Sequence, residues 1–219
     1  NAPSTVRTFG RAVSLTDVAD LVKESGEVAK AQSVELWDGL DRAIHVTVAG
    51  QAAGVFTDAD LRRLGAALEA ARDPGSRVLL ENFRPLAVAL RAMVTVDDRY
   101  VRSGVLAAVR AAVADALSFD SALLGTPLHL SDVYRVIQDV DGVLASDVVE
   151  LEAKRPADRD RPGADRLGDG TPAPVQAHLQ VERAQPDPTR PGSIVPAELA
   201  VVESPGRDID VTATGGLDG

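Results

Sequence analysis

The chain has 219 residues, a formal net charge of −10 and no cysteine. The acidic balance argues against direct nucleic-acid binding, because that role needs a basic face to neutralise phosphates. The lack of cysteine excludes disulfides, thiolate metal sites and cysteine catalysis. No apolar run approaches the roughly 18 residues that span a bilayer, and no signal peptide opens the sequence. Because it begins with Asn1 rather than Met, we expect the C-terminal part of a longer protein.

A gapless internal repeat relates residues 13–36 to residues 128–151 at a constant offset of 115. The identical pairs are mostly apolar, capping or turn positions, so the repeat describes scaffold more than chemistry. Each copy predicts a helix entered through Thr16 or Ser131, then a tight turn and a strand ending in Val-Glu-Leu. Such a duplication in a chain of this length favours two small domains.

The first predicted domain spans residues 1–84. After the first repeat copy, residues 37–48 predict a β-hairpin around an Asp-Gly turn, with one buried face because apolar and polar residues alternate along 44–48. Residues 57–72 then predict an amphipathic helix with acidic residues at its N-terminus. Residues 77–83 complete the domain as a further strand.

The second predicted domain spans residues 85–154. A period of two along residues 86–96 predicts the clearest strand of the chain, and the spacing over residues 101–117 predicts a helix. The second repeat copy follows. The sequence thus predicts an α+β fold with two small two-layer α/β sandwich domains, each similar to a split βαβ unit and each carrying one copy of the duplicated helix-turn-strand unit.

Residues 155–219 are predicted to form an extended C-terminal tail. Its first part alternates Arg and Asp with Pro and Gly and reads as a solvated linker. Short strand-like pieces follow at 175–182, 198–203 and 208–214. They are too short to make a core alone, so we expect them to lie against the second domain or a partner chain. Deleting the tail is expected to leave both domains folded.

The sequence offers no convincing catalytic or metal site. His45, His129 and His178 lie in three different predicted elements, so we expect exposed or locally bonded histidines rather than metal ligands. The acidic pair Asp97-Asp98 follows a predicted strand as a turn. We therefore expect no catalytic residue, no cofactor and no enzymatic activity.

Six residues are candidates for contact with partner proteins. Trp37, the only tryptophan, stands at the predicted hairpin tip, where a large aromatic side chain is hard to bury internally. Phe56 is a further candidate. The tail pieces contribute the remaining four: Glu198, Leu199, Ile209 and Val211.

Several segments resemble the baseplate J-like family, the wedge proteins of contractile phage tails and bacterial contractile injection systems. The similarity covers about residues 1–152, and the order of its motifs carries it more than any single one. The segments are RAVSLTDV at 11–18, GEVAKA at 26–31, WDG at 37–39, the strand at 86–96, GTPLHLSDVY at 125–134 and DGV at 141–143.

This resemblance implies assembly rather than catalysis. Wedge proteins of this family bind partner wedge subunits, join neighbouring wedges into a ring around the spike and hub, and hold the sheath. The implied location is the bacterial cytoplasm, within an assembled particle, or a phage virion baseplate; the implied partners include no nucleic acid and no membrane span. The competing hypothesis is a small-ligand-binding or enzymatic α+β module, because such domains host many activities.

Overall fold

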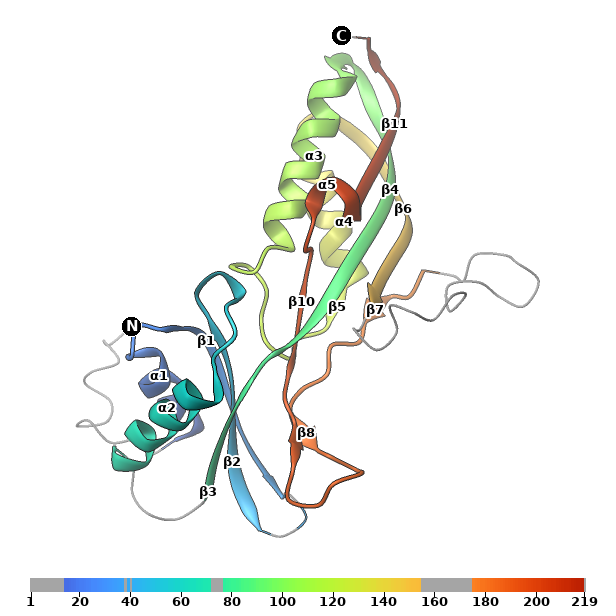
Figure 1. Cartoon of the computed structure of the whole chain (residues 1–219). Helices are drawn as coiled ribbons and strands as arrows, with labels where there is room; N and C mark the ends of the chain where they lie inside the picture. Colours follow the sequence, from blue (N-terminus) through green and yellow to red (C-terminus); the bar gives the residue numbers. More distant parts are fainter. Residues whose placement is uncertain (1–13, 38, 40, 72–76, 155–174, 219) are drawn as a thin grey trace. The chain divides into compact units, whose positions relative to one another are not determined.

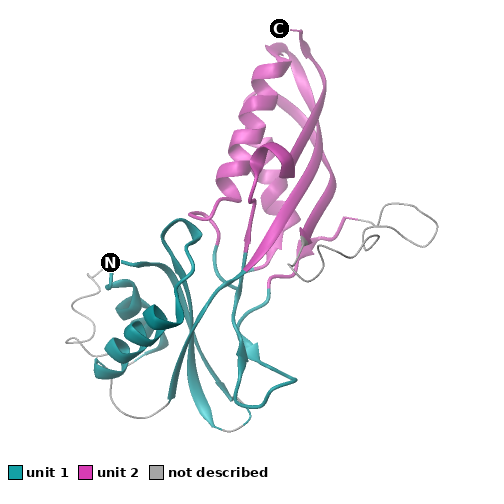
Figure 2. Ribbon diagram, viewed as in Figure 1, with its two compact units in different colours: residues 1–84, 123–126, 182–199 teal, residues 85–122, 127–181, 200–219 magenta. Residues whose placement is uncertain are grey.

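The structure is a computed structural model that describes residues 14–37, 39, 41–71, 77–154 and 175–218. The chain divides into two compact units, drawn in different colours in Figure 2. Each unit contains segments that are distant in sequence. Unit 1 comprises residues 1–84, 123–126 and 182–199, and unit 2 comprises residues 85–122, 127–181 and 200–219.

Unit 1 is built on a three-stranded sheet in the order β1-β2-β3. Strands β1 and β2 are antiparallel and form the predicted hairpin, whereas β2 and β3 are parallel and joined through helix α2. The elements are α1 (Leu15–Lys23), β1 (Val28–Trp37), β2 (Arg42–Gly50), the 3₁₀ turn η2 (Gln51–Ala53), α2 (Asp58–Ala70) and β3 (Arg77–Asn82). Figure 1 labels these helices and strands, though not the 3₁₀ turn.

Helices α1 and α2 pack on one face of this sheet. Their apolar stripes meet the side chains of β2 that alternate toward them, because successive residues of a strand point to opposite faces. This buried cluster contains Val18, Val22, Val28, Val46, Val48, Leu64 and Leu68. The low aromatic content leaves the packing to Val and Leu.

The opposite face of the unit 1 sheet is also buried. His45 and Thr47, expected on an exposed face, are both 0% exposed. The tail returns over this face: the Ala197 amide donates to the Thr47 hydroxyl at 3.1 Å. The burial of this face could not be predicted from local sequence patterns, because the covering residue Ala197 lies 150 residues after Thr47. Strands β8 (Gln185–Pro186) and β9 (Ile194–Val195) form a short hairpin within it.

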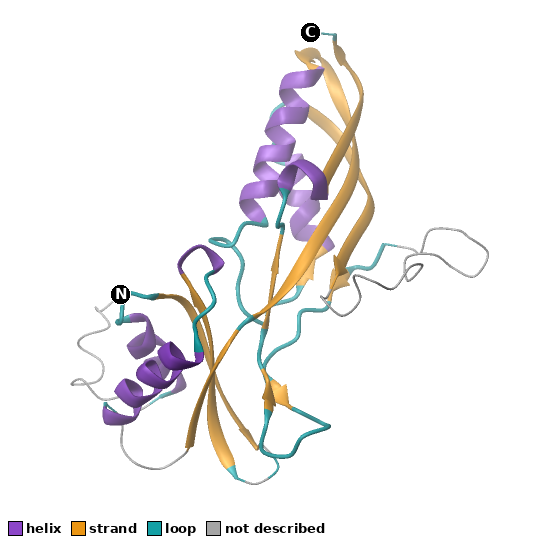
Figure 3. Ribbon diagram, in the orientation of Figure 1, coloured by secondary structure: helices purple, strands orange, loops and turns teal. Residues whose placement is uncertain are grey.

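Unit 2 has a second sheet centred on the long strand β4 (Arg84–Val101). Strand β6 (Val143–Lys154) pairs antiparallel with β4, and β11 (Ile209–Leu217) pairs parallel with it. Strand β10 (Glu198–Val201) joins the same sheet. The remaining elements are α3 (Arg102–Ala116), β5 (Leu128–His129), α4 (Leu130–Gln138), β7 (His178–Leu179) and α5 (Pro205–Asp208). Figure 3 shows helices and strands in separate colours.

The core of unit 2 lies between this sheet and helices α3 and α4. Every second residue of β4 from Leu86 to Val96 is buried, as the period of two predicts. These side chains meet Val105, Val109 and Val113 of α3 together with Ile137 of α4. The strand continues to Val101, five residues beyond the segment that the alternation marked.

The duplicated helix-turn-strand unit is confirmed in both copies. Helices α1 and α4 begin and end at equivalent positions, and β1 and β6 begin at equivalent valines. The predicted caps are wrong. Ser14, not Thr16, caps α1, because its extended backbone lets its hydroxyl accept from the Asp17 amide; in the second copy the N-cap position is His129, without a side-chain cap.

The tail agrees with the sequence-based expectation in part, since β11 lies against the second domain, and differs from it where residues 182–199 belong to unit 1. Its segments are distributed between the two units rather than forming a separate extension. Strand β11 supplies an edge strand of the unit 2 sheet, and residues 182–199 cover the unit 1 sheet. The linker predicted at 155–170 lies outside the described residues. Strands β7, β8, β9 and β11 of the tail each pair with another strand of this chain.

Candidate interaction surfaces

A strained loop follows β2 and projects an apolar side chain into solvent. Ala52 and Ala53 have φ values of 52° and 61°, in the left-handed region that L-residues rarely adopt. Backbone bonds close the loop: the Gly50 amide donates to the Gly54 carbonyl at 2.8 Å, and the Gly54 amide donates to the Gln51 carbonyl at 3.0 Å. Val55 is 69% exposed. We call residues 50–57 the Val55 loop.

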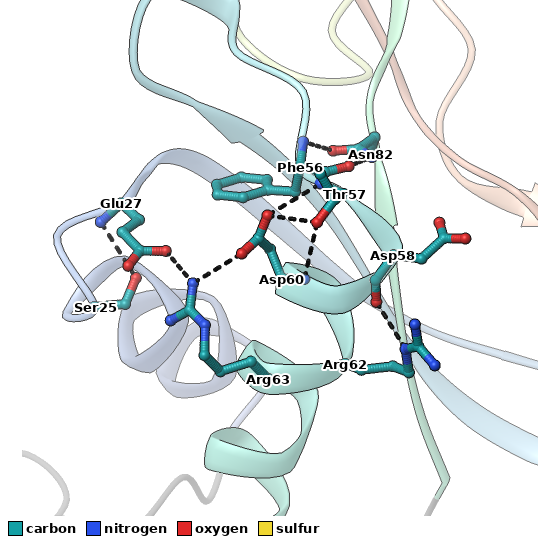
Figure 4. Close-up of polar contacts among 9 residues, drawn as sticks. All are labelled: Ser25, Glu27, Phe56, Thr57, Asp58, Asp60, Arg62, Arg63 and Asn82. Carbon is teal, nitrogen blue, oxygen red and sulfur yellow. Dashed lines mark hydrogen bonds and ion pairs between the residues drawn. The ribbon is translucent and has the colours of Figure 1, made fainter.

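The side chain of Asn82 on β3 holds the far end of the Val55 loop. The amide of Phe56 donates to the Asn82 side-chain oxygen, and the Asn82 side-chain nitrogen donates to the Phe56 carbonyl, both at 2.9 Å. Figure 4 shows this two-way clamp. Phe56 itself is half-buried and packs against the unit 1 core. Its contact with a partner stays a prediction.

The N-terminus of α2 fixes the loop from the other side. Thr57 and Asp60 form a capping box, and the Thr57 hydroxyl donates to the Asp60 carboxylate at 2.7 Å. Arg63 bridges Asp60 at 3.2 Å and Glu27 at 2.6 Å (Figure 4). The Thr57 hydroxyl, followed by Arg63, lowers the pKa of Asp60 below its ordinary value of 3.8. The loop is therefore pre-organised for contact, which reduces the entropy cost of binding.

The hairpin tip bearing Trp37 is a second exposed surface of unit 1. Trp37 ends β1, lies opposite Arg42 in the register and is 58% exposed. The tail hairpin lies against this tip, since a Cβ placed on Gly39 would stand 3.4 Å from Cα of Pro191. Figure 1 lets the reader follow both hairpins. We call this surface the Trp37 tip.

The tail hairpin beside the Trp37 tip is ordered by Asp187. Its carboxylate accepts from the Thr189 hydroxyl at 2.6 Å and the Thr189 amide at 2.8 Å, and also from Arg190 at 3.0 Å. These bonds, the Thr189 hydroxyl foremost, lower the pKa of Asp187 to about 2. The loop therefore stays charged and bonded at neutral pH.

Four of the six predicted contact residues are buried inside the chain. Glu198, Leu199, Ile209 and Val211 are each exposed by 3% or less. The Glu198 carboxylate accepts from the Glu182 amide at 2.9 Å and pairs with Arg84 at 3.2 Å. This differs from the sequence-based expectation, because the tail strands complete the cores of their own units rather than facing a partner.

Strand β6 carries a further exposed apolar pair that the sequence did not mark. The register with β4 shifts twice, which leaves Leu144 and Val149 as the extra residues at two bulges. Both side chains are exposed. Alternation alone could not identify them, nor Val55, because bulges and irregular loops interrupt the periodicity that sequence reasoning uses. We call this pair the β6 edge.

Two of the three histidines lie close together, although the sequence predicts that all three are dispersed. His45 is fully buried, with the Glu81 carboxylate 3.8 Å from its Nε2. His129 and His178 lie side by side on β5 and β7, with ring centroids 6.0 Å apart. Across the described ranges, no three metal-ligating side chains gather into one site. Nor does any described helix have the length and apolarity to cross a membrane.

These observations define the protein as a two-unit α+β chain that exposes large apolar side chains on the Val55 loop, the Trp37 tip and the β6 edge. Residues 10–81 match the family model of the Baseplate J-like central domain. The resemblance to the baseplate J-like family is thus confirmed over residues 10–81, which contain the Val55 loop and the Trp37 tip.

Comparison with other proteins gives two further results. No curated protein matches the chain. Among fifteen matching chains of solved structures is one from the "Cryo-EM structure of the anti-feeding prophage (AFP) baseplate, 6-fold symmetrised", with 16% sequence identity and a TM-score of 0.49. That match covers 70% of this chain and 36% of the other, so the chain spans about a third of that protein's length.

Proposed function

We propose that this chain is a structural component of the baseplate of a contractile injection system or phage tail. The observation that carries the proposal is the Baseplate J-like central domain at residues 10–81. In this role the chain works by protein–protein contact and has no catalytic activity. It acts as a wedge subunit that joins other wedge subunits and neighbouring copies into a ring, which surrounds the spike and hub and couples to the sheath.

The surfaces of the two units suit such a role. Rigid exposed apolar side chains at the centre of a contact give the most binding free energy, with tryptophan especially favoured. The Trp37 tip and the Val55 loop both present exposed apolar side chains, and the Asn82 side chain holds the backbone of the Val55 loop. The particle assembles in the bacterial cytoplasm or stands in a phage virion. We assign both surfaces to contacts with neighbouring baseplate subunits.

A reconstitution experiment tests this proposal. The particle's genes are expressed together with Val55→Asp or Trp37→Ala in this chain, and assembled particles are counted by negative-stain electron microscopy. We expect at least a tenfold loss of particles for each variant, because removing a central contact side chain costs about 2 kcal/mol or more.

The control is Ala67→Asp, which adds one carboxylate to an exposed position of α2 in the same unit. It should leave particle numbers within twofold of the parent. Thermal unfolding of each purified variant separates lost contact from lost fold. Particles that form and contract normally with a folded Val55→Asp, Trp37→Ala double variant would overturn the assignment of these surfaces.

A further inference from the structure

Two exposed histidines occupy one rung of a β-ladder in unit 2. Strands β5 and β7 pair antiparallel with His129 opposite His178. Their ring centroids are 6.0 Å apart and the rings are tilted by 44°. Both side chains are exposed. The two residues come from distant parts of the chain, so the fold alone creates their proximity.

The backbone hydrogen bonds explain why the imidazoles approach each other. The Leu130 amide donates to the Ala177 carbonyl at 3.0 Å, which makes the next rung a hydrogen-bonded pair. Rungs alternate along an antiparallel ladder, so His129 and His178 form a non-hydrogen-bonded pair. In such pairs the Cα atoms are only about 4.5 Å apart and the side chains on the same face come closest.

This geometry suits a transition-metal ion. Histidine nitrogen binds zinc at about 2.0–2.1 Å, which places each ring centroid about 3 Å from the ion and the two centroids about 5–6 Å apart. The observed separation of 6.0 Å falls at the edge of that range. Exposed imidazoles can turn about their side-chain torsions to complete the approach.

We propose that His129 and His178 form a two-histidine site for a divalent zinc, nickel or copper ion. Imidazole nitrogen suits each of these ions, and solvent completes the coordination because both side chains face water. The ion joins β7 to β5, whose own pairing extends over only two residues each. It thus fastens the start of the C-terminal segment to the second repeat copy. This inference does not depend on the proposed function.

Titration calorimetry of the full chain with zinc chloride tests the site. The protein must be purified without a polyhistidine tag and treated with a chelator beforehand. We expect one ion per chain and a higher midpoint of thermal unfolding with zinc, because binding to the folded state alone stabilises it. His129→Ala and His178→Ala should each weaken binding by at least about tenfold, since even outer partners of metal ligands cost that much.

The matched control is Gln180→Ala, an exposed neighbour on β7's side of the pair that carries no imidazole. It should bind zinc as the parent does. Absence of binding at millimolar zinc would overturn the proposal. Binding that survives in both histidine variants would overturn it equally, because the ion would then be held by other groups. Circular dichroism of each variant confirms that the fold is retained, and nickel titration provides a second probe of the same pair.

Discussion

Ala52 and Ala53 are the residues where local backbone preference and the observed conformation disagree most. A left-handed conformation costs an L-residue roughly 1–2 kcal/mol, and two consecutive alanines incur that cost twice. Such outliers persist when surrounding structure over-determines them, and they concentrate at active sites, ligand clamps and switch regions. Here the Gly50–Gly54 bond and the Asn82 clamp impose the conformation from both ends.

Replacing either alanine with glycine should stabilise the protein. Ala52→Gly and Ala53→Gly each remove the steric cost but add chain entropy in the unfolded state, so we expect a net gain of about 0.5–1 kcal/mol. Chemical denaturation measures it. The same change at Ala67, an exposed position in α2, should instead destabilise by about 1 kcal/mol. A change in the free energy of unfolding with the same sign at all three positions would refute the strain argument.

The exposure of a side chain could be predicted from the sequence where it depends only on residues nearby in the chain. Trp37 at a hairpin tip is exposed as expected. His45 is not, because its burial depends on a segment that is distant in sequence. The pairing of His129 with His178 likewise arises from strand register, which carries no local signal for two-residue strands. A local sequence pattern predicts on which face of a strand a side chain lies, but not whether a distant segment covers that face.

At the scale of elements, the Thr57–Asp60 capping box links helix stability to pH. The pKa of Asp60 lies below 3.8 in the folded chain, mainly because the Thr57 hydroxyl donates to the charged carboxylate. A depressed folded pKa contributes stability that is fully present above the unfolded value near 4. That contribution is lost as the pH falls through the lower folded pKa.

Thr57→Ala should therefore have two measurable effects. Loss of the cap should destabilise the protein by about 1 kcal/mol at neutral pH, and the pKa of Asp60 should rise toward 3.8. Carboxyl-carbon NMR titration follows the second effect. Ser14→Ala, which removes the equivalent cap of α1, should cost similar stability but leave the Asp60 pKa unchanged. An unchanged Asp60 pKa in Thr57→Ala would contradict the assigned cause.

Elements with strong periodicity could be predicted from the sequence, and their pairing could not. The period of two along β4 and the repeated α1-β1 and α4-β6 segments carry local signals that the fold preserves. Both sheets also share one pairing plan: the repeat strand is antiparallel to a central strand that is parallel to a third. That third strand in unit 2 is β11, which no local pattern connects to β4.

At the scale of the whole molecule, we expect strand β11 to be required for the fold of unit 2, in contrast to the sequence-based expectation that both domains fold without the tail. Deleting residues 204–219 removes β11 and withdraws Ile209 and Val211 from the core. Losing two buried aliphatic side chains costs about 4 kcal/mol or more, a large part of a domain's stability. Hydrogen-exchange mass spectrometry should show strongly reduced protection of β4 and α3.

A shorter deletion serves as the control. Removing residues 218–219 takes away the exposed ion pair of Arg102 with Asp218 but leaves β11 in place. Exposed ion pairs contribute little, so exchange in β4 should stay as in the parent. Full protection of β4 in the longer deletion would show that β11 is dispensable.

The return of the tail into both units also sets the timing of folding during synthesis. The contact of Thr47 with Ala197 and that of Arg110 with Val211 each join residues more than 100 positions apart. Contacts of such long range fold slowly, because chain closure precedes the gain from packing. A nascent chain therefore cannot complete the unit 1 core before residues 182–199 have left the ribosome, or the unit 2 core before β11 has done so. The finished surfaces of each unit therefore become available to other proteins only after these distant segments have been synthesised.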